Sequence, residues 1–308
     1  MKMERITSFP YIGREYTGII KKSLENLGLN VMLPPKTTDK TIKIGVKNSS
    51  DMMCHPYKVT LGNFVEALEN GANTLLTYNS LGQCRLRHYH KIQEFTLKNL
   101  GYDNFELYGI SRKNIFKTLK KLTNKSRFKL FLEFYNLYKN MKEKDEKRVW
   151  AKDKSNIGII GEIFSCCDEI VNYGIEGKIK RYGANPYNTV RLTDFINRNF
   201  LGLHPAGEKK YRKKARGYFN GKLGGHGVEN ISNLLKLIDK GVDGVIHILP
   251  LSCMPETTVE PIIDYICRNS RTPSLRITID ENISEANLET RLETFIELIK
   301  IKKWKKHT

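Results

Sequence analysis

The sequence predicts an α/β protein whose strands form mainly parallel sheets covered by helices, with one added helical segment. Short apolar runs alternate with helical patterns over most of the chain, which is typical of parallel strands joined by helical crossovers. Residues 112–150 are helical and Lys-rich and interrupt that alternation. The length of 308 residues suits two domains, although one large α/β domain is also consistent with it.

The first third of the chain gives the clearest alternation. Helical spacing predicts a helix up to Leu27, a second from Cys54 to Gly71, and a third over 85–100. Residues 37–49 are short and mixed in character. Apolar runs predict strands at 5–12, 29–33, 72–78 and 105–110.

The helical segment 112–150 carries a stripe of large side chains on one face. Such a stripe is typical of a packing face against the core or against another subunit. An aromatic platform for nucleic acid is the alternative, but such platforms usually come from sheet surfaces. The stripe consists of Phe131, Phe134, Tyr135, Tyr138 and Met141.

The α/β pattern resumes after residue 150. A basic stretch runs from Glu208 to Lys214, and the Lys-rich end at 302–306 is expected to fray. Strands are predicted over 156–164, 242–249 and 274–279. Helices are predicted over 171–182, from the glycine run at 224–227 to about Asp239, over 256–268 and over 287–301.

Composition narrows the class of protein. A hydrophobic content of 40% and a charged content of 28% suit a globular protein with a sizeable core. No apolar run reaches the roughly 18 residues of a membrane span, and the N-terminus lacks a signal-peptide core, so we expect a cytoplasmic protein without a membrane partner. The net charge of +19 is consistent with a Lys-rich surface that has no specific role. It is also consistent with binding of nucleic acid, of an acidic protein partner or of a polyphosphate substrate.

Three cysteines share one local context. Cys54, Cys84 and Cys253 each precede a predicted helix, where free backbone N–H groups favour a thiolate. Thiolates select iron–sulfur clusters or zinc, and the absence of a C-x₂₋₄-C pair argues against a small zinc module. A 4Fe–4S cluster on three thiolates would keep one iron open to water, substrate or another side chain. We therefore expect these three cysteines to ligate one metal centre.

The other cysteines fit that centre less well. Cys166 and Cys167 follow a predicted strand, but adjacent residues project in different directions, so at most one of them can join. Their role stays open from the sequence. Cys267 lies within a predicted helix and is expected in the core.

Two further segments carry weaker candidates. Gly224, Gly225 and Gly227 around His226 precede a helix, and their backbone N–H groups are candidates to cradle an anion or substrate, although a plain loop fits equally. His226 and Glu281 are the candidate catalytic groups, as proton donor and acid/base. His247, inside a buried strand, is expected to be a core residue. No Walker A loop, Rossmann glycine fingerprint or nucleophile elbow is present, so we expect the protein not to bind ATP or NAD of its own.

Seven segments in matching order carry a resemblance to a known superfamily. The chain resembles the CoA-substrate-specific enzyme activase-like branch of the 2-hydroxyacyl-CoA dehydratase/benzoyl-CoA reductase superfamily. Cys-Met-Pro-Glu at 253–256 and Thr-Ile-Asp-Glu at 278–281 are the most specific matches. The others are Cys-His-Pro-Tyr-Lys at 54–58, Leu-Gly-Asn-Phe at 61–64, Gly-Gln-Cys-Arg at 82–85, Gly-Glu-Ile-Phe at 161–164 and Gly-Gly-His-Gly at 224–227.

The resemblance implies a fold and a role. It implies two lobes with Rossmann-like sheets, at 1–111 and 151–308, around the insert at 112–150, with a 4Fe–4S cluster held by Cys54, Cys84 and Cys253. It also implies a dehydratase-like or ATP-dependent reductase component of anaerobic metabolism. A separate ATP-hydrolysing iron–sulfur activase would reduce the cluster, and an activated, CoA-type substrate would accept the electron. Whether the chain pairs with a second copy or another subunit stays open.

Two alternatives come from other classes of protein. A basic nucleic-acid-binding protein without enzymatic activity would explain the +19 charge and the clusters at 209–214 and 302–306. A structural zinc site on the same thiols is the weaker alternative. The basic helix-forming insert and Arg85-Leu86-Arg87-His88-Tyr89 depart from the resembled branch, which is less basic there, so the substrate and the docking surface are not predicted.

Overall fold

The computed structural model describes residues 4–79, 84–203, 208–219, 223 and 225–304. The chain divides into two compact units. The first unit comprises Met1–Glu146 and Phe195–Leu203, and the second comprises Lys147–Asp194 and His204–Thr308. The helices of the Lys-rich segment 112–146 therefore group with the first unit, and a short later segment of the chain returns to it.

The first unit is built on a four-stranded, all-parallel sheet of order β2-β1-β3-β4. Its strands are β1 (Ile6–Ser8), β2 (Asn30–Val31), β3 (Thr74–Tyr78) and β4 (Glu106–Ile110). Its helices are α1 (Arg14–Asn26), α2 (Asp39–Lys47), α3 (His55–Glu69), the 3₁₀ turn η1 (Arg85–His88), α4 (Tyr89–Asn99), α5 (Ile115–Thr123), α6 (Arg127–Glu146) and the π-helical turn η2 (Asn197–Leu201).

The second unit repeats this topology. Its sheet is also four-stranded and parallel, with the order β6-β5-β7-β8, so in both units the strand order reads second, first, third, fourth. Its strands are β5 (Asn156–Gly161), β6 (Asn185–Asn188), β7 (Gly244–Pro250) and β8 (Ser274–Ile279). Its helices are α7 (Ile163–Cys167), α8 (Ile175–Arg181), α10 (Glu208–Arg216), α11 (Gly227–Asp239), α12 (Met254–Asn269) and α13 (Glu285–Trp304), while α9 (Leu192–Ile196) crosses the boundary between the units.

The predicted fold class is confirmed, because both sheets are parallel and covered by helices. Each sheet has its own core. Val228, Ile231 and Leu234 of α11 pack with Ile160 and Val245 in the second unit. In this strand order the second strand of each sheet lies on one side of the first strand, and the third strand lies on its other side. The crevice at the carboxyl ends of the first and third strands is where such folds place their ligands.

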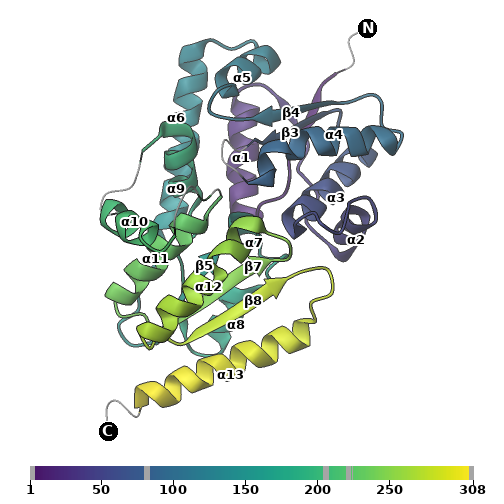
Figure 1. Ribbon diagram of the computed structural model, residues 1–308. Coiled ribbons are helices and arrows are strands. Elements are labelled where there is room, and N and C mark those ends of the chain that lie inside the picture. The colour runs from purple at the N-terminus through teal and green to yellow at the C-terminus, as the bar shows by residue number, and fades with distance from the viewer. Residues whose placement is uncertain (1–3, 80–83, 204–207, 220–222, 224, 305–308) are drawn as a thin grey trace. The chain divides into compact units, whose positions relative to one another are not determined.

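Helix α6 packs on α1 in a way that differs from the predicted stripe. Phe131 and Tyr135 of that stripe are 62% and 56% exposed, and of its residues only Met141 is buried. Two acidic side chains share the buried face instead, because α1 offers them partners. Asp145 accepts a short hydrogen bond from the Tyr16 hydroxyl, and Glu133 accepts one from Asn26 at 3.1 Å. Figure 1 shows α6 running beside α1.

Several element boundaries also differ from prediction. The first strand ends at Ser8, and β5 ends at Gly161, where the Glu162 side chain caps α7. Helix α8, predicted to start at residue 171, begins at Ile175. No helix among the described residues combines the length and the apolar character that crossing a membrane requires.

Candidate functional site

Cys54 caps the N-terminus of α3. Its backbone is extended (φ −69°, ψ 151°), its carbonyl accepts the Tyr57 N–H at 2.9 Å, and Pro56 occupies the first turn, where its missing N–H costs nothing. The helix that follows is buried from His55 to Ala67. The Cys54 side chain is only 8% exposed, so its sulfur lies in a site shielded from water.

Cys84 starts the 3₁₀ turn η1 that leads into α4. Two contacts tie this segment to the Cys54 loop. The Arg85 guanidinium donates a short hydrogen bond to the Met52 carbonyl, and the Tyr89 hydroxyl contacts the Cys54 Sγ. The Tyr89 ring also packs edge-on against Tyr57, with ring centroids 4.8 Å apart. The first unit therefore brings together the segments of two of the three predicted ligands.

The same edge of the first sheet carries buried polar oxygens. Cys84 follows β3, and α3 starts with Cys54 at the end of the unit where the parallel strands finish. Ser8 Oγ, at the end of β1, and Asn79 Oδ1, just beyond β3, are buried and have no hydrogen-bond partner among the described residues. Buried polar atoms without a protein partner are normally satisfied by water or ligand. The strand ends thus offer polar groups for a bound molecule.

Cys253 occupies the matching place in the second unit. Both Cys84 and Cys253 follow the third strand of their sheet, and Cys253 caps α12 with Pro255 in its first turn. Its N–H donates to the Pro250 carbonyl at 3.0 Å, and Ser252 before it adopts a left-handed backbone with φ of 60°. The Cys253 side chain is 5% exposed. The tight turn after β7 therefore places the buried Cys253 thiol at the end of that strand.

A buried polar network supports the start of α12. Glu256, in the first turn of α12, is fully buried and accepts two hydrogen bonds from the Asn230 amide at 2.7 and 2.8 Å. His247 Nε2 lies 2.8 Å from the same carboxylate. Asn230 also accepts the Gly161 N–H at 3.1 Å. The network therefore joins β5, β7, α11 and α12 at one strand edge.

Glu162 adds a second carboxyl group at this edge. It accepts hydrogen bonds from the N–H groups of Phe164 and Ser165, both at 2.9 Å, and so caps α7. Burial raises the pKa of Glu162 from 4.5 to about 7, a shift that these hydrogen bonds oppose and the nearby Glu256 charge increases. The carboxyl group thus titrates near neutral pH. Sequence patterns did not single out Glu162, Asn230 or Glu256 as functional, although the Gly-Glu-Ile-Phe match included Glu162 and the Cys-Met-Pro-Glu match included Glu256.

His247 lies in the core, as expected, and its partner there is a carboxylate. Cys267 is also buried in the core of the second unit, and burial raises the pKa of its thiol to about 11. Burial likewise raises the pKa of the Cys166 thiol, with the neighbouring Cys167 adding to the shift. These thiols are held in the neutral form, which is a poor metal ligand.

The glycine run has a packing role at its end. Gly227 begins α11, and a Cβ there would lie 2.5 Å from Leu223 Cδ2 and 2.8 Å from Val259 Cγ1, so a side chain would collide with the core. Gly225 has a positive φ of 66°, and His226 is the residue that precedes α11. Gly224 lies outside the described residues.

Glu281 lies in the turn between β8 and α13. The preceding Asp280 accepts the Asn282 N–H at 2.9 Å, an arrangement typical of an Asx turn. Within the parts of the chain that the structure describes, no three His, Cys, Asp or Glu side chains are grouped to hold a metal ion. Cys253 belongs to the second unit, whereas Cys54 and Cys84 belong to the first.

Comparison with known proteins yields no family. No family model matches the chain, and no curated protein matches it.

Proposed function

We propose that this protein is an iron–sulfur component of a dehydratase-like or ATP-dependent reductase system, with Cys54, Cys84 and Cys253 as the ligands of one 4Fe–4S cluster. The observation that carries the proposal is the pairing of the Cys54 and Cys84 segments by Tyr89 and Arg85. Three thiols that each cap a helix at a strand end are a donor set that suits such a cluster.

The protein would supply position and environment. When bound, the cluster would accept one electron from a separate ATP-hydrolysing activase and deliver it to an activated, CoA-type substrate. Burial of Cys54 and Cys253 would exclude water from two of the ligands. The helix N-termini that these cysteines cap would stabilise the negative charge on sulfur. The Tyr89 hydroxyl would hydrogen-bond the Cys54 sulfur and hold its side chain in one orientation.

Anaerobic purification and reconstitution test the proposal. The expected result is equal iron and sulfide at the stoichiometry of one cluster per chain, with an electron paramagnetic resonance signal after reduction. Replacing Cys54, Cys84 or Cys253 singly with Ala should lower the iron content. Cys166→Ala and Cys267→Ala are matched controls that should retain it, because these thiols are neutral and buried elsewhere. A wild-type chain that stays colourless and free of iron after reconstitution would refute the proposal.

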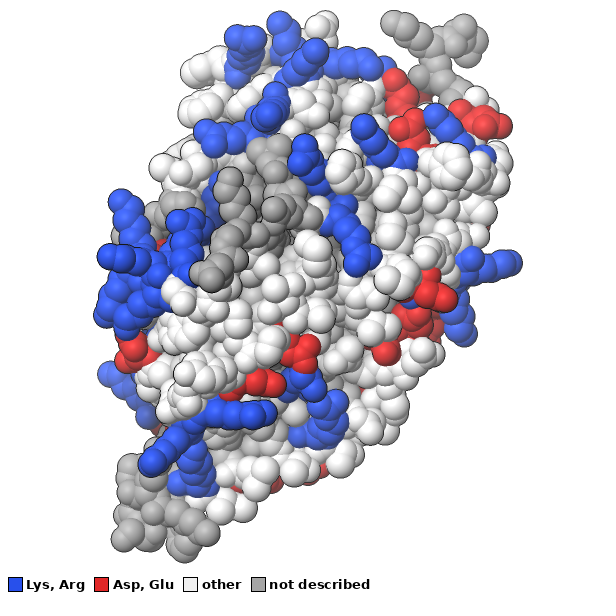
Figure 2. Space-filling view, viewed as in Figure 1, with Lys and Arg blue, Asp and Glu red and all other residues white. Residues whose placement is uncertain are grey.

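A second candidate function is binding of a polyanion such as RNA through α10. This helix in the second unit exposes Lys209, Lys213, Lys214 and Arg216, none of which forms an ion pair with a carboxylate in the described residues. Figure 2 shows Lys and Arg side chains gathered most densely where α10 lies. Fluorescence anisotropy with a labelled single-stranded RNA tests it. Affinity should fall steeply with salt. Affinity that Lys213→Gln/Lys214→Gln does not change would contradict it.

A further inference from the structure

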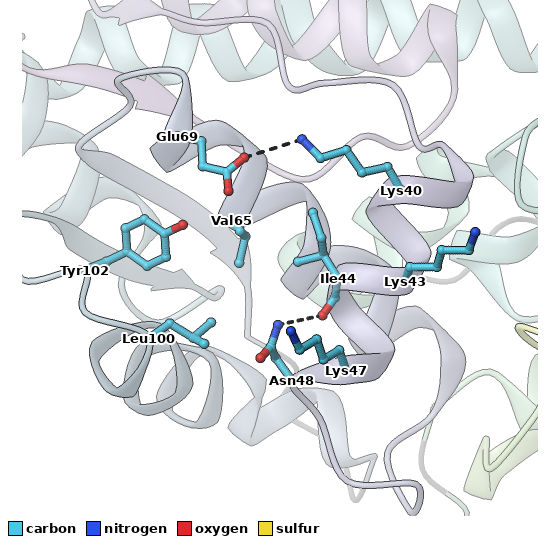
Figure 3. A pocket seen from close by; sticks show the side chains of 9 residues that line it. All are labelled: Lys40, Lys43, Ile44, Lys47, Asn48, Val65, Glu69, Leu100 and Tyr102. Atoms are coloured by element: carbon cyan, nitrogen blue, oxygen red, sulfur yellow. Dashed lines mark hydrogen bonds and ion pairs between the residues drawn. The ribbon is translucent and has the colours of Figure 1, made fainter.

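A pocket of about 520 Å³ lies beside α2 in the first unit (Figure 3). One wall is the outer face of α2. The opposite wall is formed by Leu100 and Tyr102, just after α4, and Val65 and Glu69 of α3 lie between them. The volume falls in the range of pockets that bind small molecules. None of the candidate cysteines lines it.

The α2 wall is positively charged. Lys40, Lys43 and Lys47 lie at positions i, i+3 and i+7, which places them in one column along the helix. Lys40 pairs with Glu69 at 3.6 Å, whereas Lys43 and Lys47 form no ion pair within the described parts of the chain. Like charges four residues apart destabilise a helix by a few tenths of a kcal/mol. An anion placed between Lys43 and Lys47 would remove that repulsion.

The opposite wall is apolar and partly open to solvent. Leu100 is 40% exposed although it lies beside the buried Val65. Tyr102 presents its ring to the pocket, and its hydroxyl points toward Glu69 (Figure 3). Burial, together with the Glu69 charge, raises the pKa of Tyr102, so the phenol stays protonated and can donate a hydrogen bond. This wall suits the flat face of a ring rather than a simple ion.

Helix α2 is held rigidly in place. At its crossing with α3, a Cβ on Gly45 would lie 1.8 Å from the Lys58 carbonyl oxygen, so the two backbones are in direct contact. The Thr41 hydroxyl donates to Glu66 at 2.6 Å, and Thr38 closes a capping box at the start of the helix. The backbone that carries the lysine column is therefore held in place before any ligand arrives, so binding has only side chains to order.

We propose that this pocket binds a nucleoside phosphate. The phosphates would lie against the Lys47 ammonium group, and the Lys43 side chain, which extends away from Leu100 and Tyr102 in Figure 3, would turn toward them on binding. The base would pack on Leu100 and Tyr102, and the sugar hydroxyls would donate to Glu69. Side-chain ammonium groups would hold the phosphates, in contrast to the backbone N–H groups of a glycine-rich loop. The proposal does not depend on the iron–sulfur centre.

Isothermal titration of the full chain at low salt tests the proposal with three probes: ADP, adenosine and inorganic pyrophosphate. We expect saturable binding of ADP, with adenosine and pyrophosphate each weaker by about tenfold or more, because each keeps only part of the contacts. Lys43→Gln/Lys47→Gln should weaken ADP binding by about tenfold or more, since charge-assisted hydrogen bonds to phosphate are lost.

The matched control is Lys117→Gln/Lys120→Gln, which removes the same charge from exposed positions on α5 of the same unit. It should leave the affinity for ADP unchanged. All four lysines are exposed, so an unshifted melting temperature confirms that both variants fold. Absence of ADP binding, equal weakening by the control, or pyrophosphate binding as tightly as ADP would each overturn the proposal.

Discussion

The contact between α2 and α3 allows a sharp test, which is the substitution Gly45→Ala. The added Cβ would lie 1.8 Å from the Lys58 carbonyl oxygen and 2.5 Å from its carbonyl carbon. No rotamer change can relieve an overlap with backbone, so the helices must separate. Overpacking of this kind costs about 3 kcal/mol at the upper end of its usual range. Higher helix propensity of Ala returns about 1 kcal/mol, which leaves a net loss of about 2 kcal/mol.

Gly18→Ala is the matched control, because Gly18 lies inside α1 and a Cβ there meets nothing within 4 Å. It should stabilise the chain by up to about 1 kcal/mol. The two variants should therefore differ by about 3 kcal/mol, or roughly 10 °C in melting temperature for a unit of this size. Gly62→Ala should behave like Gly45→Ala, since its Cβ would lie 2.0 Å from the Thr41 carbonyl oxygen.

Thermal unfolding followed by far-ultraviolet circular dichroism measures the difference. Both tryptophans, Trp150 and Trp304, belong to the second unit, so their fluorescence gives an internal reference for the unit that is not changed. The Gly45→Ala transition should move in the dichroism trace. If Gly45→Ala and Gly18→Ala melt at the same temperature, the close approach of the two helices is wrong.

Three other predictions concern the strand edges. Asn230→Asp places a second carboxylate within hydrogen-bonding distance of Glu256, so it should destabilise the chain by about 3 kcal/mol at neutral pH. The loss should be smaller at acidic pH, and urea unfolding at neutral and acidic pH measures both values. The raised pKa of Glu162 means that its protonated form stabilises the fold fully below pH 4.5 and that this contribution is lost as the pH rises through about 7. Glu162→Gln should therefore flatten the dependence of the free energy of unfolding on pH between 4.5 and about 7. The raised pKa corresponds to at most about 3 kcal/mol, and the partial exposure of Glu162 lowers this figure. A pH profile equal to that of the wild type would contradict the raised pKa of Glu162. If the proposed cluster is present, Tyr89→Phe should retain iron and lower the midpoint potential, because a hydrogen bond to the Cys54 sulfur is removed; a potential equal to wild type would contradict this role.

Helix α2 shows why part of the fold could not be predicted from the sequence. Residues 37–49 look short and mixed, because Gly45 and the four β-branched residues of α2 lower the helix propensity of the segment. The capping box of Thr38 and Thr41 supplies a start signal. What makes the glycine favourable is its contact with Lys58, which is distant in sequence and leaves no local pattern.

Strand β6 was not predicted from the sequence, for a different reason. Three of its four residues, two Asn and one Pro, have low strand propensity, and proline cannot donate to a sheet ladder. Pro186 is tolerated because β6 is an edge strand, paired only with β5. The strands of the two sheet centres were predictable, since β3, β5 and β7 are continuous buried runs.

The candidate site was predictable at its helix starts and not in its contacts. Proline two residues after Cys54 and Cys253 marks the first turn of a helix, and both helices begin there. The contact between Cys54 and Tyr89 joins residues 35 positions apart. The bond between Asn230 and Glu256 spans 26 positions, with no periodicity to reveal it. Such pairs are set by packing, which a single sequence does not display.

The return of residues 195–203 to the first unit has a consequence for synthesis of the protein. Phe195 and Phe200 pack on Tyr78 with ring centroids 4.7 and 5.6 Å apart, and Phe200 also reaches Phe134. On the ribosome, this aromatic cluster cannot close until nearly fifty residues of the second unit have followed Glu146 out of the exit tunnel. A nascent chain that stalls before Phe195 would leave Tyr78 and Phe134 uncovered, and chaperones bind such apolar surfaces.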